Sequence, residues 1–135
     1  MGKHKNTVLV QAIFGAFLRG DVPAIVGKLA DNVEWTVGVP SDAVPIFGTF
    51  KGKAAVQAFL QTLGQSVDIK TFEPTEYISQ YDKIAVQVHM EFTVKKTGKQ
   101  VAQDIVTVWS VQDMKVTKFR SYEDTAAVIK AWTGG

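Results

Sequence analysis

One acid stands inside an otherwise apolar stretch near the C-terminus, residues 101–111. Asp104 could act there as a general base, because a carboxylate among apolar neighbours binds a proton more tightly. Side chains alternate between the two faces of a strand, so Asp104 is expected on the outer face, opposite Gln103 and Thr107, where it would meet a cross-strand Lys, Arg or dimer partner. A β-bulge between Val101 and Thr107 would instead turn Asp104 inward and make it the best candidate for a catalytic base.

A second group of side chains has the composition of a pocket wall. Aromatic rings exclude water from such a pocket, and a few hydroxyl or amide groups orient a mainly apolar ligand. Each of these residues also has a purely structural alternative, since buried Trp usually packs and buried hydroxyls and amides usually find protein partners. The expected ligand-binding residues are Phe17, Trp35, Val37, Gln103, Thr107, Trp109, Phe119 and Ser121.

The indole of Trp35 carries one polar group, its N–H. Trp35 is expected to face inward beside Val37 on a strand over residues 33–39. Its ring could be a core aromatic only, or it could wall a pocket with its N–H pointing at a ligand.

His89 and Glu91 lie two residues apart on one expected strand face and are a possible metal-binding pair. A third ligand is missing, because the only other histidine is His4, in a terminal segment expected to fray, and the chain has no cysteine. Neither a phosphate-binding glycine loop nor a nucleophile elbow appears. We therefore expect no metal and no cofactor.

Composition restricts the classes of partner. Fifteen Lys and Arg against thirteen Asp and Glu leave a formal charge of +2, and the basic residues are scattered, so no nucleic-acid partner is expected. No apolar run approaches the ~20 residues of a membrane span, and no signal peptide is apparent, so we expect no membrane partner and a cytoplasmic location. The length suits one domain over residues 1–135.

Periodicity predicts the elements that position these residues. Helical spacing covers residues 7–19, with Gly20 ending the helix, and Asp21 can cap a short second helix. Residues 40–52 read as a mobile loop, and a third helix should stop at Gly64. Strands are expected over residues 67–72, 76–79 and 84–94, then a long hairpin over 101–122, and Asp124 can cap a last short helix.

The predicted architecture follows from the hairpin, whose strands are largely apolar on both faces. Such strands need two covers. We expect an α+β fold: a long, curved antiparallel or mixed sheet with three helices packed in its concave face, plus a short C-terminal helix. Ala102, Val106 and Val108 would otherwise face water, so a homodimer through the outer face is expected.

Three strings resemble the nuclear transport factor 2-like superfamily, especially its ketosteroid-isomerase-related and SnoaL-like polyketide cyclase branches. They are FLRGDVPAIVGKLADNVEW (residues 17–35), GTFKGKAAVQAFL (48–60) and VWSVQDMKVTKFRSYEDT (108–125). The resemblance implies a cone-shaped α+β barrel with an apolar pocket at its open end. One departure is Met114, where the family often has glycine after the turn aspartate, so this turn is expected to differ in type.

The resemblance also shows which chemistry is missing. The positions that match the base, the tyrosine and the second proton donor of ketosteroid isomerases hold Val37, Ile13 and Thr107, and the cyclase acid is matched by Ser121. These residues argue against steroid isomerisation and against cyclisation by the known mechanisms. Our first hypothesis is a pocket protein that binds a small apolar molecule, with cofactor-independent isomerase, cyclase or hydrolase chemistry if it is an enzyme. The alternatives are a non-catalytic ligand-binding or interaction module and, less favoured, protein recognition by the exposed sheet.

Overall fold

The structure, a computed structural model, describes residues 2–134, with side chains from Lys5 onward. The described chain forms four helices and six strands in the order α1 (Gly2–Leu18), α2 (Val22–Val26), β1 (Leu29–Val37), β2 (Gly48–Lys51), α3 (Lys53–Ser66), β3 (Val67–Gln80), β4 (Lys83–Val94), β5 (Gln100–Gln112), β6 (Lys115–Tyr122) and α4 (Thr125–Thr133). None of the described helices is long and apolar enough to cross a bilayer.

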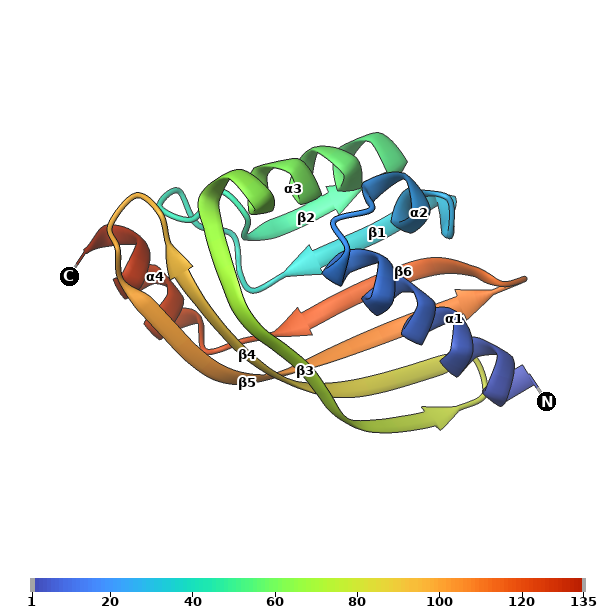
Figure 1. Cartoon of the computed structure of the whole chain (residues 1–135). Helices are drawn as coiled ribbons and strands as arrows, with labels where there is room; N and C mark the ends of the chain where they lie inside the picture. The colour runs from blue at the N-terminus through green and yellow to red at the C-terminus, as the bar shows by residue number, and fades with distance from the viewer. Residues whose placement is uncertain (1, 135) are drawn as a thin grey trace.

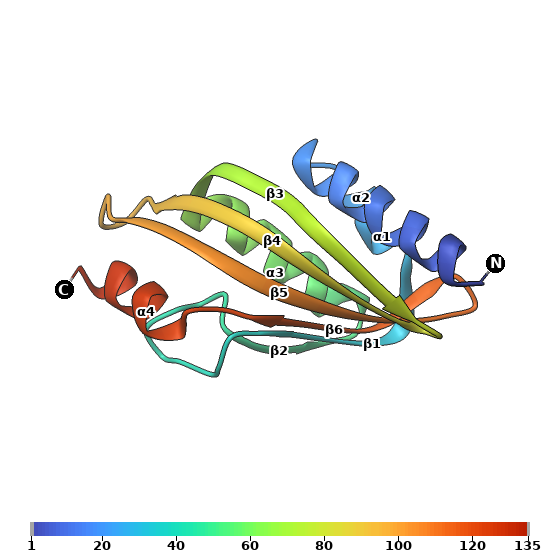
Figure 2. The same cartoon turned by 90° about the horizontal axis from the view of Figure 1, so that it is seen from below.

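All six strands form one curved, unclosed sheet in the order β2-β1-β6-β5-β4-β3. The sheet is mixed, because β1 runs parallel to β6 while every other neighbouring pair is antiparallel. Helices α1 and α3 cover the hollow of the sheet, and α4 lies near the β4–β5 turn (Figures 1 and 2). The predicted α+β fold is confirmed.

Alternation along β5 decides which of its side chains reach the core. Trp109 is 1% exposed and Thr107 is 2% exposed, whereas Val106, on the other face, is 40% exposed. Strand β4 alternates in the same way and pairs with β5 without a register shift. The inner face of the sheet therefore meets the helices in one continuous apolar core.

Several predicted boundaries are wrong. Helix α1 begins at Gly2, so Asn6 and Thr7 lie within the helix and do not cap it. Gly64 does not stop α3, which continues to Ser66 and passes directly into β3. The segment expected to be a loop contains β2, and residues 67–80 form one strand with irregular pairing near Pro74.

The two short-range caps predicted near the first helices are confirmed. Gly20 follows α1 with a φ of 70°, the left-handed conformation that glycine adopts without strain. The Asp21 carboxylate accepts a hydrogen bond from the Ala24 N–H at 3.2 Å, which satisfies one free donor of α2.

The β5–β6 turn has a strained backbone. Asp113 and Met114 have φ values of 53° and 59°, so both central residues are left-handed, as in the turns that suit a tight hairpin. The expectation that Met114 would impose a different turn is therefore wrong. The twist of the long hairpin outweighs the local cost of a side chain at positive φ.

Candidate functional site

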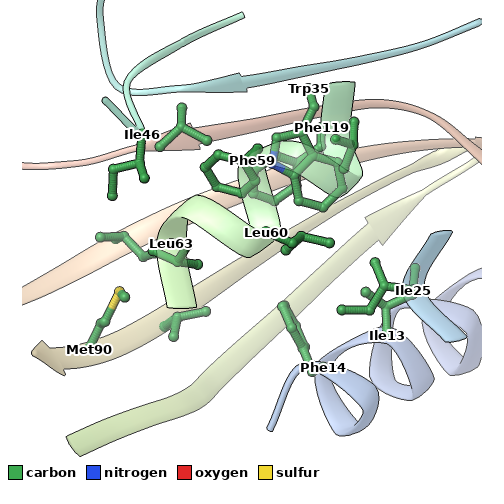
Figure 3. Packing of buried hydrophobic residues seen from close by; sticks show 14 of the residues in the cluster. Ile13, Phe14, Ile25, Trp35, Ile46, Phe59, Leu60, Leu63, Met90 and Phe119 are labelled. Atoms are coloured by element: carbon green, nitrogen blue, oxygen red, sulfur yellow. The ribbon is translucent and has the colours of Figure 1, made fainter. Parts of the chain in front are cut away.

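A cavity of about 90 Å³ lies between the inner face of the sheet and the helices. Helix α1 contributes Ile13, Phe14 and Phe17 to its wall, and α3 contributes Phe59 and other apolar side chains. Figure 3 shows these side chains converging from the helices and the sheet. The amphipathic spacing of the two helices produces this wall, because each helix turns its apolar stripe toward the strands.

The sheet supplies the aromatic part of the wall. Trp35 and Phe119 stand opposite each other on the parallel strands β1 and β6, and their rings stack at 4.0 Å with 20° between the planes. Trp109 of β5 meets Phe119 edge-on, with ring centroids 4.6 Å apart. Rings packed in these geometries contribute more than their buried area and hold one another in place.

Two polar groups of the wall satisfy each other. The Trp109 indole N–H donates to the Thr107 hydroxyl at 2.9 Å, and that hydroxyl donates to the Val86 carbonyl at 3.3 Å. Both side chains are therefore fixed by hydrogen bonds inside the protein.

Glu123 is the charged residue of the cavity wall, just beyond the end of β6. Its carboxylate accepts hydrogen bonds from the Ser121 hydroxyl at 2.7 Å and from the Gln103 amide at 3.2 Å. Gln103 is itself oriented by the Asp124 backbone N–H, which donates to its side-chain oxygen at 2.9 Å. A chain of contacts from β5 to the start of α4 thus holds one carboxylate against the cavity.

Burial raises the pKa of Glu123 above its ordinary value, because an apolar environment disfavours the charged form. The hydrogen bonds from Ser121 and Gln103 act in the opposite direction and lower the pKa by stabilising the carboxylate, but desolvation is the larger effect. The group is therefore a stronger base than an exposed glutamate and is held in one orientation.

Most of the expected pocket residues meet at this cavity. Gln103 is buried at 7% exposure, but it supports Glu123 from behind and does not form part of the wall. The remaining residues of the set do contribute to the wall: Phe17, Trp35, Val37, Thr107, Trp109, Phe119 and Ser121. That they bind a ligand stays a prediction.

Asp104 lies outside the cavity, on the outer face of the sheet. The bulge that would have turned it inward is absent, because β4 and β5 pair in continuous register from Lys83 to Thr93. The Asp104 carboxylate meets His89 across the strands at 2.8 Å, in place of the expected Lys or Arg. The expectation that Asp104 could turn inward and act as general base is therefore wrong for this arrangement.

His89 lies between two carboxylates on that outer face. Its Nδ1 is 2.8 Å from Asp104 and its Nε2 is 2.8 Å from Glu91. The hydrogen bond to Glu91, followed by the one to Asp104, raises the pKa of His89. Both ring nitrogens lie within hydrogen-bond distance of a carboxylate, and both donate when the imidazole is protonated. No cluster of three or more side chains positioned for a metal occurs in the described part of the chain.

Sequence reasoning missed Glu123. Alternation along the last predicted strand assigns a face to Ser121. Glu123, two positions later, falls between that strand and Asp124, the residue expected to cap the last helix. A signal was present nonetheless: residues two apart share a strand face, so an inward Ser121 points Glu123 inward as well. The Ser-x-Glu spacing at the strand end could have identified it.

Comparison with known proteins agrees with this geometry. An NTF2-like protein from Burkholderia xenovorans LB400 is 33% identical, with a TM-score of 0.88 over 97% of this chain and 98% of that one. An NTF2-like protein of unknown function from Burkholderia pseudomallei K96243 is 26% identical, with a TM-score of 0.85 over 96% and 98% of the two chains. TerC, co-crystallised with polyporic acid, is 25% identical, with a TM-score of 0.83 over 96% and 98%.

Among curated proteins, none matches the chain significantly. The SnoaL-like domain family matches residues 10–119, which include the C-terminal half of α1, all of α3 and the aromatic wall residues Trp35, Trp109 and Phe119. The chain therefore belongs to the SnoaL-like domain family, within the nuclear transport factor 2-like superfamily.

Proposed function

We propose that this protein binds a small apolar molecule in the cavity and that Glu123 moves a proton on it, without a cofactor. The observation that carries the proposal is a single half-buried carboxyl in a wall of aromatic and aliphatic side chains. Such a wall limits the access of water, and a carboxylate with fewer water contacts is a stronger base than one in solution. The chemistry that fits is isomerisation, cyclisation or water addition that begins with removal of a proton.

In this proposal one residue transfers the proton and two residues orient it. Glu123 takes the proton, and Ser121 and Gln103 hold its carboxylate in place through their hydrogen bonds. The donors also oppose the effect of burial, because their hydrogen bonds stabilise the ionised carboxylate and lower its pKa. In this arrangement the base follows the end of β6 and lies two residues after Ser121, the position matched to the cyclase acid.

The size of the cavity limits the ligand. About 90 Å³ is less than the roughly 150 Å³ of an engineered cavity that accepts benzene. A six-membered ring therefore already requires α1 or α3 to shift outward, and small ring compounds are the first ligands to test because they require the smallest shift. Polyporic acid, with which TerC was crystallised, belongs in the same panel as a larger member.

The test measures, by NMR, how fast the α-protons of cyclic ketones and enones exchange for deuterium in D₂O. The wild-type protein should accelerate exchange, and Glu123→Gln should lower the rate by about 10²- to 10⁴-fold, the contribution typical of a positioned base. Asp104→Asn is the matched control, since it also neutralises one carboxylate but on the outer face, and it should leave exchange unchanged.

The alternative is a non-catalytic binding or interaction module on the same fold. It predicts that panel members bind the wild-type protein and the Glu123→Gln variant while neither protein accelerates exchange. That outcome would reject proton transfer and retain ligand binding. Failure of every panel member to bind would reject the proposal as a whole.

We also propose a homodimer through the outer sheet face. Val106 is 40% exposed there, and Ala102 is exposed beside the strand pair. Light scattering at micromolar concentration should return twice the chain mass, and Val106→Asp should return the monomer. A monomeric wild-type protein would reject this assignment. A cytoplasmic location likewise stays a prediction from the sequence.

A further inference from the structure

The Trp35 indole N–H is a buried donor without a hydrogen-bond partner among the described residues. Trp35 is 5% exposed, so water does not readily replace the missing partner. Figure 3 shows its ring within the apolar cluster, between Phe59 and Phe119. Buried polar groups are nearly always paired in folded proteins, and an unpaired one lowers stability unless something else occupies it.

The other polar groups of the cavity are already occupied. The Trp109 N–H donates to Thr107, whose hydroxyl donates to a backbone carbonyl, and the Ser121 hydroxyl donates to Glu123. Trp35 therefore supplies the one free donor among the side chains described in this wall. The Glu123 carboxylate, with two protein donors, keeps acceptor capacity for a further proton.

The strand register places Trp35 and Ser121, the residue that holds Glu123, at successive inward positions of one face. Trp35 stands opposite Phe119 on the parallel strands β1 and β6, and Ser121, which holds Glu123, is two residues farther along β6. Val37, the next inward residue of β1, stands opposite Ser121 and has no polar group. A ligand ring resting on this face can thus meet a donor on one side and a proton acceptor on the other.

We propose that the Trp35 N–H is the recognition donor of the cavity, and that the ligand is a small ring compound whose oxygen accepts this hydrogen bond. The inference rests on the proposed ligand-binding function and makes it more specific. The cavity selects oxygen acceptors, such as ring ketones, over hydrocarbons of the same shape, because only the oxygen satisfies the buried N–H. In a proton-transfer reaction the same contact would stabilise negative charge that develops on the oxygen.

The experiment compares two isosteric pairs: cyclohexanone with methylenecyclohexane, and acetophenone with isopropenylbenzene. Each pair differs in a C=O or C=CH₂ group and otherwise matches in shape. The wild-type protein should bind each ketone about tenfold more tightly than its hydrocarbon, the ratio of one neutral hydrogen bond. Trp35→Phe keeps an aromatic ring, removes the N–H, and should abolish this preference.

Trp109→Phe is the matched control, since it makes the same change in the same wall at an N–H that is already paired. This variant should keep the tenfold preference for the ketones. A spectroscopic readout accompanies the affinities: in a ¹⁵N–¹H spectrum, the indole signal missing from Trp35→Phe should move downfield when wild-type protein binds cyclohexanone and stay in place with methylenecyclohexane.

The outcomes separate this inference from the function on which it rests. Equal binding of ketone and hydrocarbon by the wild-type protein, or a preference that survives Trp35→Phe, would overturn the role of Trp35 and leave the cavity as a binding site. Equal binding is the result expected if the face of the Phe59 ring already accepts the Trp35 N–H. Binding of neither member of either pair would overturn the proposed function together with the inference.

Discussion

The Ser121 hydroxyl lies 2.7 Å from the Glu123 carboxylate, so the last inward residue of β6 holds the acid that follows the strand. Strand geometry explains the pairing, because residues two apart point to the same side. The resemblance to SnoaL-like cyclases matches Ser121 to their acid, and here this residue supports an acid instead. The proposed base, Glu123, lies two residues after it.

Ser121→Ala should raise the pKa of Glu123 further above its ordinary value. The hydroxyl stabilises the ionised carboxylate, and its loss leaves desolvation less opposed. In the exchange assay, the rise of the rate with pH that reports ionisation of Glu123 should shift to higher pH. A shift to lower pH, or none, would contradict the assigned hydrogen bond.

Glu123→Gln should stabilise the protein near neutral pH more than it does in acid. Because the pKa of Glu123 is raised in the folded state, the folded chain holds the proton more tightly than the unfolded chain does. The resulting stability is fully present below the unfolded value and is lost as the pH rises through the folded pKa. Glutamine does not titrate, so it escapes this loss.

Urea denaturation of both proteins across this range measures the effect. The difference in unfolding free energy between the variant and the wild type should be smallest below the ordinary glutamate pKa of 4.5 and should grow toward neutral pH. A difference that stays constant with pH would contradict a raised pKa at Glu123.

His89 should have a pKa above its ordinary value, because the hydrogen bonds to Glu91 and to Asp104 raise it. Glu91→Gln and Asp104→Asn should each lower the NMR-measured pKa of His89, since each variant removes one carboxylate partner. The contribution of His89 to stability is present below its unfolded pKa and disappears as the pH rises through the folded one. A His89 pKa that stays unchanged in either variant would contradict the corresponding contact.

Met114→Gly should stabilise the β5–β6 hairpin. Met114 has a φ of 59°, a conformation that costs a residue with a side chain about 1–2 kcal/mol. Glycine removes that cost and loses part of the gain to its greater freedom in the unfolded chain, so a net increase of about 0.5–1 kcal/mol in unfolding free energy is expected.

Gly98, in the turn between β4 and β5, offers the reverse control for the backbone strain at Met114. It has a φ of 73° and no atom near the position that a Cβ would take, so Gly98→Ala tests backbone strain without a steric clash. This variant should lose roughly 1 kcal/mol in the same denaturation experiment. A Met114→Gly variant less stable than the wild type would contradict the strain assigned to the turn.

Periodicity predicted the order of the helices and of most strands, and the resemblance of three strings to the nuclear transport factor 2-like superfamily predicted how they pack. Alternation in β5 correctly placed Trp109 inside and Asp104 outside, because β5 is paired on both edges and its register shift, between Ser110 and Val111 on the β6 edge, comes after these residues. Boundaries were harder. Gly64 resembled a helix stop, but α3 passes through it and enters β3 directly, since packing of the preceding apolar stripe outweighs one unfavourable residue.

The candidate site was only partly predictable for a different reason. Residues inside regular strands could be assigned to a face, and those include Trp35 and Phe119. Glu123 lies where the regular backbone ends, and its direction depends on the hydrogen bonds of Ser121 and Gln103. The contacts of Gln103 join β5 to the start of α4. The local Ser-x-Glu spacing can therefore indicate the direction of Glu123, but no local pattern specifies the contacts from Gln103.

The most direct test of the proposed site is the titration of Glu123 itself. The titration is monitored by ¹³C NMR of the Glu123 carboxyl carbon, in the free protein and in the protein saturated with cyclohexanone. We expect a pKa above the ordinary value of 4.5 in the free protein, and a further change in the carboxyl signal when the ligand fills the cavity. An ordinary pKa together with a signal that does not respond to ligand would contradict the assignment of Glu123 as the reactive group.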